Sequence, residues 1–465
     1  MKTEKKNRRA FVKKLGTASA ALVGIPTIIP ASALGKNGFV PPSDRITLGF
    51  IGAGNQAEND VKGFLPDKRV EVVAVCDPNK RSKGYWNGKE GGREYIIDLV
   101  NDYYSKENGK KYKGPKGYTD FRELIDKKSI DAVEIVTPDH WHSIPALMAA
   151  AAKKDIYCQK PLSLTVAEGR AMSNAAKKHN IVFQVGSQQR SNENFRWACE
   201  VVRSGKIGKL QKVTCGLPGG TPDFGKTAHL TETVPVPKDF DYNMWLGPAP
   251  EAPYCPARTH VNYRWVLDYS GGILTDWGGH HPDIAQWGIG ADGSGPVQIK
   301  NPKSKWSNHP IYNTATEFYF EAVYENGVEL IVSNTGEGID IPFGVRFHCE
   351  DGMVWADRRK KDANPKSLLD IELEDKDRLY TSDNHYRNFI DCVISREQPV
   401  APCEVGHRSI TIAHLGNIAM MLNQDLEWDP VKEEVKNNFA ANHLLYRKMR
   451  APWDKVYRKY EALIQ

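Results

Sequence analysis

A glycine-rich turn early in the chain is the clearest candidate for a binding site. Gly52-Ala53-Gly54-Asn55-Gln56-Ala57 directly follows the apolar run Ile46–Ile51 and opens a helical segment. This is the G-x-G-x-x-G/A pattern, in which the first glycine permits a tight turn and the second lets the backbone approach a pyrophosphate. The N–H groups and the positive dipole end of the following helix would then face the phosphates. We therefore expect a dinucleotide site that includes Gly52, Gly54, Asn55 and Gln56.

Asp77 indicates which dinucleotide to expect. It ends the next apolar run, at the distance of about 20 residues where a carboxylate accepts hydrogen bonds from a ribose diol. Its charge would repel a 2′-phosphate, so the sequence favours NAD. NADP stays the alternative because Lys80 and Arg81 lie nearby.

Four further motifs stand out, and three of them contain aspartate, histidine or lysine side chains that could take part in acid–base chemistry. The four motifs are Thr137-Pro138-Asp139-His140-Trp141-His142, Gln159-Lys160-Pro161, Tyr242-Asn243-Met244-Trp245-Leu246-Gly247-Pro248 and Asp276-Trp277-Gly278-Gly279-His280-His281-Pro282-Asp283. Removal of hydride from a secondary alcohol requires loss of the hydroxyl proton, and histidine is the natural acceptor near neutral pH. Asp276 lies one helical turn before His280, a spacing that would let the carboxylate orient the imidazole.

From about Arg45 to Leu422 these motifs resemble those of the glucose–fructose oxidoreductase/inositol dehydrogenase (Gfo/Idh/MocA) family. The resemblance implies a Rossmann domain followed by an α/β domain with a large, mainly antiparallel open sheet. Because such a sheet can mediate oligomers, we expect a homodimer or homotetramer. One departure is Gln159, where the family usually has glutamate, and it removes a negative neighbour of Lys160.

The resemblance also implies catalytic roles for three residues. Lys160 matches the lysine of the family's Glu-Lys-Pro motif, beside the nicotinamide and the substrate hydroxyl, where it would stabilise alkoxide charge or relay the proton. Asp276 and His280 match the family's Asp-x-x-x-His pair, so we expect His280 to be the base and Asp276 to orient it. The alternatives are that His281 exchanges roles with His280, or that His280 is a structural histidine.

The remaining candidate residues fall into a cofactor group and a substrate group. The cofactor group comprises Thr137, Pro138, His142, Gln159 and Gln188, with His142 beside the nicotinamide by resemblance. The substrate group comprises His281 together with His260, Tyr263 and Arg264 of the aromatic-rich loop Tyr254–Trp265. Aromatic faces pack on sugar C–H surfaces, and arginine binds hydroxyls or carboxylates. The alternative is a loop packed by its own aromatic side chains.

Metal and disulfide chemistry are not expected. His140, His142, Asp276, His280, His281 and Asp283 have permissive local spacings, but the two groups lie far apart in the sequence. None of the eight cysteines forms a CxxC pair. Cys76 and Cys158 end apolar runs, so mostly free, buried thiols are predicted.

The N-terminus is typical of an export signal. Asn7-Arg8-Arg9-Ala10-Phe11 precedes the apolar run Leu15–Pro30, and Ala31-Ser32-Ala33 offers a cleavage site. The arginine pair resembles a twin-arginine signal, which implies a periplasmic protein exported already folded, with its NAD tightly bound. A membrane anchor is the alternative, but the run is shorter than the ~20 residues needed to span and contains proline. No stable membrane insertion is therefore expected after the signal is removed.

The charge distribution excludes nucleic acid as a default partner. The chain has 63 Lys+Arg and 57 Asp+Glu, a net charge of +6, and residues 1–33 carry all of that excess. The remaining chain has no net charge, so it lacks the field expected of a phosphate-backbone binder.

The hydrophobic pattern predicts an α/β fold in two parts. Apolar strands alternate with helices up to about residue 207, which is typical of a parallel sheet with helices on both faces. Gly84–Gly117 is interpreted as a surface insertion with one helix near Tyr95–Tyr104. Asn326-Gly327 and Asp351-Gly352 predict hairpins in the second part. The expected divisions are an export signal (1–33), a Rossmann domain (45–165), an α/β substrate and oligomerisation domain (166–384), and C-terminal helices (385–465) that pack back on the Rossmann domain.

These observations favour an NAD(P)-dependent enzyme that oxidises a secondary hydroxyl of a sugar or glycoside, at C3, with a carbohydrate as its partner. One alternative is a glycosidase that oxidises C3 transiently and then eliminates the aglycone. The Asp276-x-x-x-His280 pair keeps the dehydrogenase pattern and argues against it. A second alternative is a non-catalytic protein that binds sugar and cofactor.

Overall fold

The computed structural model describes residues 41, 44–109, 111–337 and 343–464. The predicted export signal at residues 1–33 lies outside this part of the chain. Residues from Ile46 onward form one unit, which is described below. Within the described ranges, no helix combines the length and the apolar character that a membrane crossing requires.

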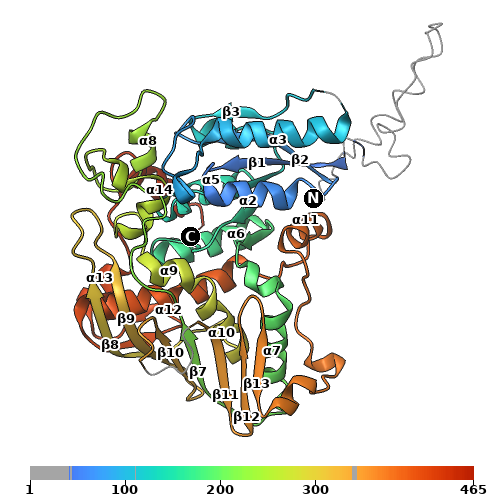
Figure 1. Cartoon of the computed structure of the whole chain (residues 1–465), viewed down its shortest axis with the longest axis vertical. Helices are drawn as coiled ribbons and strands as arrows, with labels where there is room; N and C mark the ends of the chain where they lie inside the picture. The colour runs from blue at the N-terminus through green and yellow to red at the C-terminus, as the bar shows by residue number, and fades with distance from the viewer. Residues whose placement is uncertain (1–40, 42–43, 110, 338–342, 465) are drawn as a thin grey trace, which may run out of the picture. The chain divides into compact units, whose positions relative to one another are not determined.

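The N-terminal half is built on a six-stranded parallel sheet in the order β3-β2-β1-β4-β5-β6 (Figure 1). Its strands are β1 (Ile46–Ile51), β2 (Val70–Cys76), β3 (Lys116–Tyr118), β4 (Ala132–Ile135), β5 (Asp155–Cys158) and β6 (Phe183–Val185). The connecting helices are α2 (Asn55–Phe64), α3 (Arg93–Asn108), α4 (Phe121–Ile125), α5 (Ser143–Ala151) and α6 (Val166–His179). This strand order is that of the Rossmann fold, and ligands bind where the order reverses, beside β1 and β4. The predicted fold class is confirmed.

Two expectations for this half differ from the structure. Gly84–Gly117 is not simply a surface insertion: α3 is the crossover helix between β2 and β3, and its Ile96 and Val100 are fully buried. The polar residues of α3 face solvent and mask this role in the sequence. The parallel sheet also continues beyond residue 165, because β6 forms its edge next to β5.

The second half is built on a nine-stranded sheet in the order β13-β12-β11-β7-β10-β9-β8-β14-β15. Its strands are β7 (Leu210–Gly216), β8 (Gln298–Trp306), β9 (Ala315–Val323), β10 (Glu329–Ser333), β11 (Gly344–Cys349), β12 (Gly352–Ala356), β13 (Lys361–Asn364), β14 (Leu426–Asp429) and β15 (Glu434–Val435). Among the strand pairs formed by the described residues of this sheet, β7–β10 is the parallel one. The two predicted hairpins are present as β9–β10 and β11–β12. The C-terminal segment adds β14 and β15 to this sheet as well as helices.

Helices lie between the two sheets and at the chain end. They are α7 (Glu193–Arg203), α8 (Tyr242–Leu246), α9 (Gly272–Gly278), α10 (His281–Ile289), α11 (His385–Ser395), α12 (Cys403–Leu422), α13 (Phe439–Leu444) and α14 (Trp453–Glu461). α11 packs against α2, and α14 packs against α5, so both of these C-terminal helices contact the Rossmann half. The eight cysteines are free and buried, as predicted.

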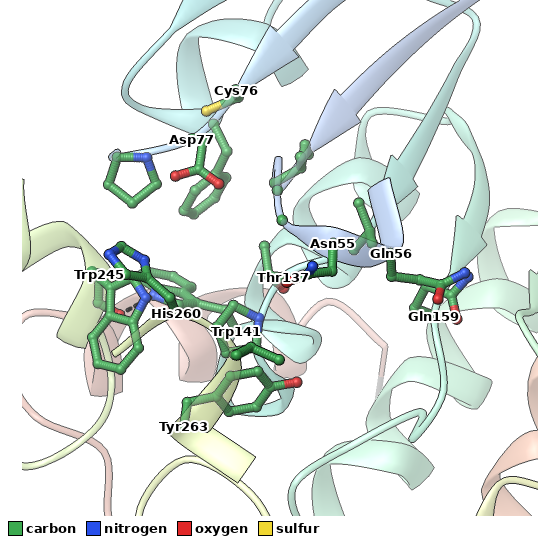
Figure 2. A pocket seen from close by; sticks show the side chains of 18 of the residues that line it. Asn55, Gln56, Cys76, Asp77, Thr137, Trp141, Gln159, Trp245, His260 and Tyr263 are labelled. Atoms are coloured by element: carbon green, nitrogen blue, oxygen red, sulfur yellow. Dashed lines mark hydrogen bonds between the residues drawn. The ribbon is translucent and has the colours of Figure 1, made fainter. Parts of the chain in front are cut away.

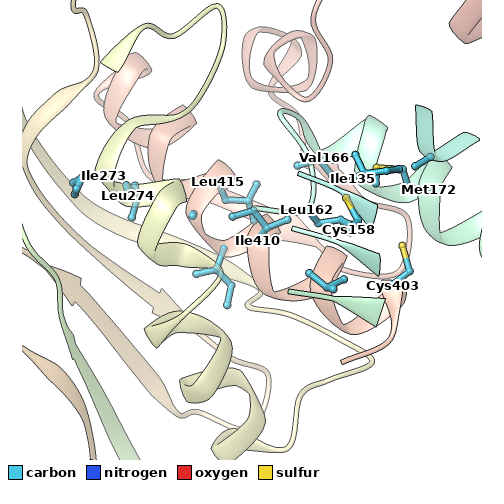
Figure 3. Close-up of a cluster of buried hydrophobic side chains, with 14 of the residues drawn as sticks. Ile135, Cys158, Leu162, Val166, Met172, Ile273, Leu274, Cys403, Ile410 and Leu415 are labelled. Atoms are coloured by element: carbon cyan, nitrogen blue, oxygen red, sulfur yellow. The ribbon is translucent and has the colours of Figure 1, made fainter. Parts of the chain in front are cut away.

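Helix α12 belongs to the core of both halves. It packs against α6 and β6 of the parallel sheet and against α9, α10 and β8 of the second sheet. Figure 3 shows Ile410 and Leu415 of α12 between Leu162 of the first half and Leu274 of the second. One continuous hydrophobic cluster therefore joins the two sheets, and the groups held between them share a rigid frame.

Candidate functional site

A cleft of about 1000 Å³ opens at the point where the strand order of the parallel sheet reverses. It is bounded by the ends of β1, β2, β4 and β5 and by residues 244–264 of the second half. Twelve predicted site residues line it: Gly52, Gly54, Asn55, Gln56, Asp77, Thr137, Pro138, Gln159, Lys160, His260, Tyr263 and Arg264. Figure 2 shows Asp77 across this space from Trp245 and His260, with Asn55 and Thr137 between them and Gln159.

The glycine turn between β1 and α2 has the shape that a pyrophosphate needs. Gly52 has a φ of 103°, and a Cβ there would lie 2.5 Å from the carbonyl oxygen of Val136, so only glycine fits. Gly54 is the N-cap of α2, and no side chain caps its free N–H groups. The Thr137 hydroxyl is buried, has no hydrogen-bond partner in the part of the chain that the structure describes, and lies in the same cleft. These uncapped donors and this unpaired hydroxyl fit a bound dinucleotide.

Asp77 lies at the other end of the nucleotide site. Its carboxylate accepts hydrogen bonds from the backbone N–H groups of Ala53 and Asn79, both at 2.7 Å, and so fixes the glycine turn. Burial raises the pKa of Asp77 to about 6, although both amide hydrogen bonds act in the opposite direction. The remaining lone pairs of the carboxylate suit the hydroxyls of a ribose.

NAD retention should therefore weaken as the pH falls through about 6, because protonated Asp77 accepts fewer hydrogen bonds from the ribose. Asp77→Asn should bind NAD about 10- to 100-fold more weakly at pH 8, the usual cost of losing a hydrogen bond to a charged group. Calorimetric titration of nucleotide-stripped protein between pH 5 and pH 8 measures both effects. Asp98→Asn, on the exposed face of α3, is the control. An unchanged pH dependence in Asp77→Asn would contradict the ribose assignment.

Gln159 belongs to a buried polar network under the cleft floor. Its Nε2 donates to Asp60 at 2.8 Å, and Gln56 and Tyr386 donate to the other oxygen of the same carboxylate. Burial raises the pKa of Asp60. Gln188 does not line the cleft; its amide donates to the Tyr157 hydroxyl at 3.3 Å. Position 159 therefore carries an amide where the family usually has a carboxylate. The carboxylate of this network belongs instead to Asp60, which Gln159 contacts.

The mouth of the cleft is covered by a loop clasp, which we define as residues 79–92 docked on residues 222–265. Tyr85 stacks on His260 with ring centroids 4.5 Å apart, and Trp86 stacks on Phe224 at 4.2 Å. His260 also contacts the Ser82 hydroxyl at 3.1 Å. His260 therefore lines the cleft as part of this clasp, with its ring face already covered by Tyr85.

Lys160, Asp276 and Arg264 form a charged cluster at the inner end of the cleft. The ammonium of Lys160 lies 2.8 Å from Asp276 Oδ1 and also donates to the Asp276 carbonyl. Arg264 Nε lies 3.3 Å from the same carboxylate oxygen. Burial alone would raise the pKa of Asp276, but the two cations outweigh it and lower that pKa to about 2. The carboxylate is thus ionised, and Lys160 is held in one position as a charged donor.

His280 lies beside this cluster but is not bonded to Asp276. Helix α9 ends at Gly278, so the helical spacing from Asp276 to His280 is interrupted, and Asp276 turns to Lys160 and Arg264 instead. The expected orienting contact is corrected accordingly. His280 is only 7% exposed, and its Nδ1 has no partner among the described residues. Burial, then the charges of Lys160 and Arg358, hold the pKa of His280 well below its usual value, so the ring is neutral and able to accept a proton.

Two other candidates, His281 and His142, do not line the cleft. His281 is fully buried against the second sheet, where its Nδ1 contacts the Gly216 carbonyl at 3.0 Å, so it does not exchange roles with His280. His142 has its two ring nitrogens 2.8 Å from the Pro161 carbonyl and 2.9 Å from the Thr137 carbonyl. It therefore braces the two turns that carry Lys160 and Thr137, rather than lining the nicotinamide pocket.

Tyr263 and several residues that the sequence did not single out complete the cleft. The Tyr263 hydroxyl donates to the buried carboxylate of Asp139 at 2.9 Å, and the Ser270 hydroxyl donates to its other oxygen. The additional lining side chains include Tyr85, Phe121, Trp141, Met244 and Trp245. Trp141 and Trp245 lie inside motifs noted above, but Tyr85 has no local sequence signal. Only the tertiary contact between the clasp and the second half reveals it.

Comparisons with known proteins agree with this architecture. Residues 46–187 match the model for the oxidoreductase family NAD-binding Rossmann fold, and residues 194–455 match the model for the oxidoreductase family C-terminal alpha/beta domain. The chain is 24% identical over 340 residues to the uncharacterized oxidoreductase YrbE of Bacillus subtilis, covering 72% of this chain and 81% of that protein.

Two further similarities cover different parts of the chain. A glycosyl hydrolase family 109 protein of Shewanella sp. is 27% identical over 223 residues, and this match spans 44% of each protein. The fold is shared with the aldose–aldose oxidoreductase of Caulobacter crescentus, solved with glycerol, at a TM-score of 0.56 and 16% identity over 82% of this chain and 99% of that one. On the two family models, which together span both halves of the structure, the chain belongs to the Gfo/Idh/MocA family of NAD-binding oxidoreductases.

Proposed function

We propose that the protein oxidises a secondary hydroxyl of a sugar or glycoside, at C3, with NAD as the hydride acceptor. The observation that carries this proposal is the pairing of a neutral, buried His280 with the charged Lys160–Asp276 pair at the inner end of the nucleotide cleft. NAD bound at the glycine turn would supply the hydride acceptor. Similarity to an aldose–aldose oxidoreductase and to glycosidases supports a carbohydrate as the substrate.

The roles of the chain's residues follow from their charge states. Lys160 donates a hydrogen bond to the substrate oxygen and stabilises the negative charge that develops there. His280 accepts the hydroxyl proton as the C–H bond gives up hydride, because its depressed pKa keeps it unprotonated at neutral pH. Asp276 and Arg264 hold the ammonium of Lys160 in place.

The cellular setting that we propose follows from the N-terminal sequence. A twin-arginine signal would deliver the folded protein to the periplasm with NAD already bound. The loop clasp supports tight binding, since Tyr85 and His260 line the cleft and stack on each other at its mouth. We also propose a homodimer or homotetramer formed through the outer face of the nine-stranded sheet.

The proposal is tested by the nucleotide content and redox response of the purified protein. An extract of the denatured protein should contain NAD in about one equivalent per chain. Adding the right glycoside to the intact protein should produce absorbance at 340 nm from its own bound nucleotide. Protein without any nicotinamide that also fails to bind added NAD would contradict the proposal.

A second candidate function is favoured by the similarity to glycosyl hydrolase family 109 proteins. A 3-keto glycoside has an acidic C2 proton, so its loss can eliminate the aglycone. Water would then add to the product, and NAD held at the glycine turn would supply the hydride that restores the C3 hydroxyl. Mass spectrometry of products from a glycoside panel separates the two functions: net dehydrogenation removes two mass units, whereas the glycosidase route releases free aglycone.

A further inference from the structure

Arg358 is a cation beside the candidate active site that the proposed chemistry does not use. It lies in the turn between β12 and β13, and its guanidinium is 4.9 Å from the centroid of the Trp277 ring. Trp277 in turn lies 5.4 Å, ring to ring, from His280. The Trp277 ring therefore lies next to both the Arg358 guanidinium and the ring of His280, the expected base.

The turn that carries Arg358 is held in a defined shape. The Arg358 carbonyl accepts a hydrogen bond from the Asn192 side chain at 3.2 Å. The side chain of Asp357 accepts from the backbone N–H groups of Arg359 and Lys360 at 2.7 and 2.8 Å. These bonds fix the backbone on both sides of Arg358, and the contact with the Trp277 ring places its guanidinium on the side of His280.

The side chains around Lys160 and His280 include more cations than carboxylates that pair with them. Lys160 and Arg264 share one oxygen of Asp276, and Asp139 lies close enough to act electrostatically on Arg264. Arg358 is the third cation, and its guanidinium has no hydrogen-bond acceptor or ion-pair partner in the described ranges 44–109, 111–337 and 343–464. Its charge nevertheless acts on His280, behind burial and Lys160 as a cause of the lowered pKa of that ring.

An arginine that is open to solvent, fixed in position and unpaired beside a site suits a ligand carboxylate. The planar guanidinium binds a carboxylate through two parallel hydrogen bonds, which a neutral hydroxymethyl group cannot reproduce. A bound carboxylate would also balance the excess of cations at this end of the cleft.

We propose that Arg358 binds the carboxylate of an acidic sugar, so that the preferred substrate is a uronic acid or its glycoside. This inference rests on the proposed function, because it names the substrate class of the same site. The carboxylate lies against Arg358, while the hydroxyl to be oxidised lies against Lys160 and His280.

The test compares matched pairs of methyl uronides and methyl glycosides in gluco, galacto and manno configurations. The NAD-loaded protein is mixed with each compound, and reduction of the bound nucleotide is followed at 340 nm. At least one uronide should react with a kcat/KM about 10- to 100-fold above its neutral counterpart, the range expected for a charged hydrogen-bonded contact. Arg358→Gln should remove this preference, so that the ratio of kcat/KM for the uronide to that for its neutral counterpart falls to about one.

Arg359→Ala is the matched control, since Arg359 is an exposed arginine of the same turn. It should keep the preference for the uronide. Equal losses on uronide and neutral glycoside in Arg358→Gln, or a wild-type preference for neutral glycosides, would overturn the inference and leave the proposed function standing.

A binding measurement separates failure of the inference from failure of the function. Calorimetric titration of the NAD-loaded protein with glucuronate, galacturonate and mannuronate needs no reaction. Binding that Arg358→Gln abolishes and Arg359→Ala retains, without any reduction of NAD, supports the acidic-sugar site and counts against the dehydrogenase. Equal binding to wild type and Arg358→Gln, or no binding and no reaction with any uronide, overturns the acidic-sugar site.

Discussion

Lys160→Met is expected to lower the rate of bound-NAD reduction by about 10³-fold while leaving the nucleotide in place. The substitution removes a charged donor aimed at the developing alkoxide, and loss of one such donor costs about 10²- to 10³-fold. The fold should survive, because Arg264 remains beside Asp276 and prevents that carboxylate from being left alone. Single-turnover absorbance at 340 nm measures the rate, and extraction of the denatured protein measures the nucleotide.

His280→Ala provides the comparison for that experiment. Loss of a general base typically costs 10²- to 10⁴-fold, so both variants should be slow and their effects should not add. Since the pKa of His280 lies well below its usual value, the wild-type rate should show no fall near pH 6.5 as the pH is lowered. Lys62→Met, on the exposed face of α2, should behave as wild type. Wild-type rates in His280→Ala would assign the proton to another group.

Arg190→Met should destabilise the protein by about 3–5 kcal/mol, the cost of leaving a buried charge without its partner. Arg190 is 1% exposed and lies 2.8 Å from Asp283, which is itself fully buried. It also pairs with Asp292. Arg190 follows Gln188 closely in the sequence, and the structure buries its side chain against Asp283 of α10. It therefore holds the helix whose N-cap is His280.

The free energy of unfolding in urea measures this loss of stability. Comparing the single variant with a double variant separates the contribution of charge from that of packing. In Arg190→Met/Asp283→Asn the uncompensated carboxylate is gone, so the double variant should be more stable than the single one. Arg122→Met breaks an ion pair on the surface and should cost less than about 1 kcal/mol. If the double variant were less stable than Arg190→Met, the charge argument would be wrong.

The features that could be predicted from the sequence are those that depend on neighbouring residues in the chain. β1 has the bounds of the apolar run Ile46–Ile51 that the sequence analysis singled out. The start of α6 is likewise fixed locally, because the Thr165 hydroxyl accepts from the Glu168 N–H. The glycine turn and both hairpins follow from residues that permit or require particular backbone angles. The cleft at the ends of β1 and β2 could therefore be placed from the sequence.

The contacts within the candidate active site could not be predicted in the same way. The spacing of Asp276 and His280 indicates a helical pair, but two consecutive glycines end α9 and release Asp276 toward Lys160. His281 and His142 carry the right chemistry, yet their rings are bonded to backbone carbonyls that the chain brings close only after folding. Arg358 lies in a polar turn that gives no sign of its place beside Trp277.

Helix α12 has a consequence for how the chain can be divided. Side chains of α12 pack into the hydrophobic core of both halves. A fragment that stops before residue 403 would therefore expose to water the apolar surfaces of β6 and α6 that α12 covers. The nucleotide-binding lobe is consequently no separable module, although it is contiguous in sequence. Chimeras that exchange this lobe between homologues must therefore carry the distant helix with it, because without that helix buried apolar side chains of both halves would face water.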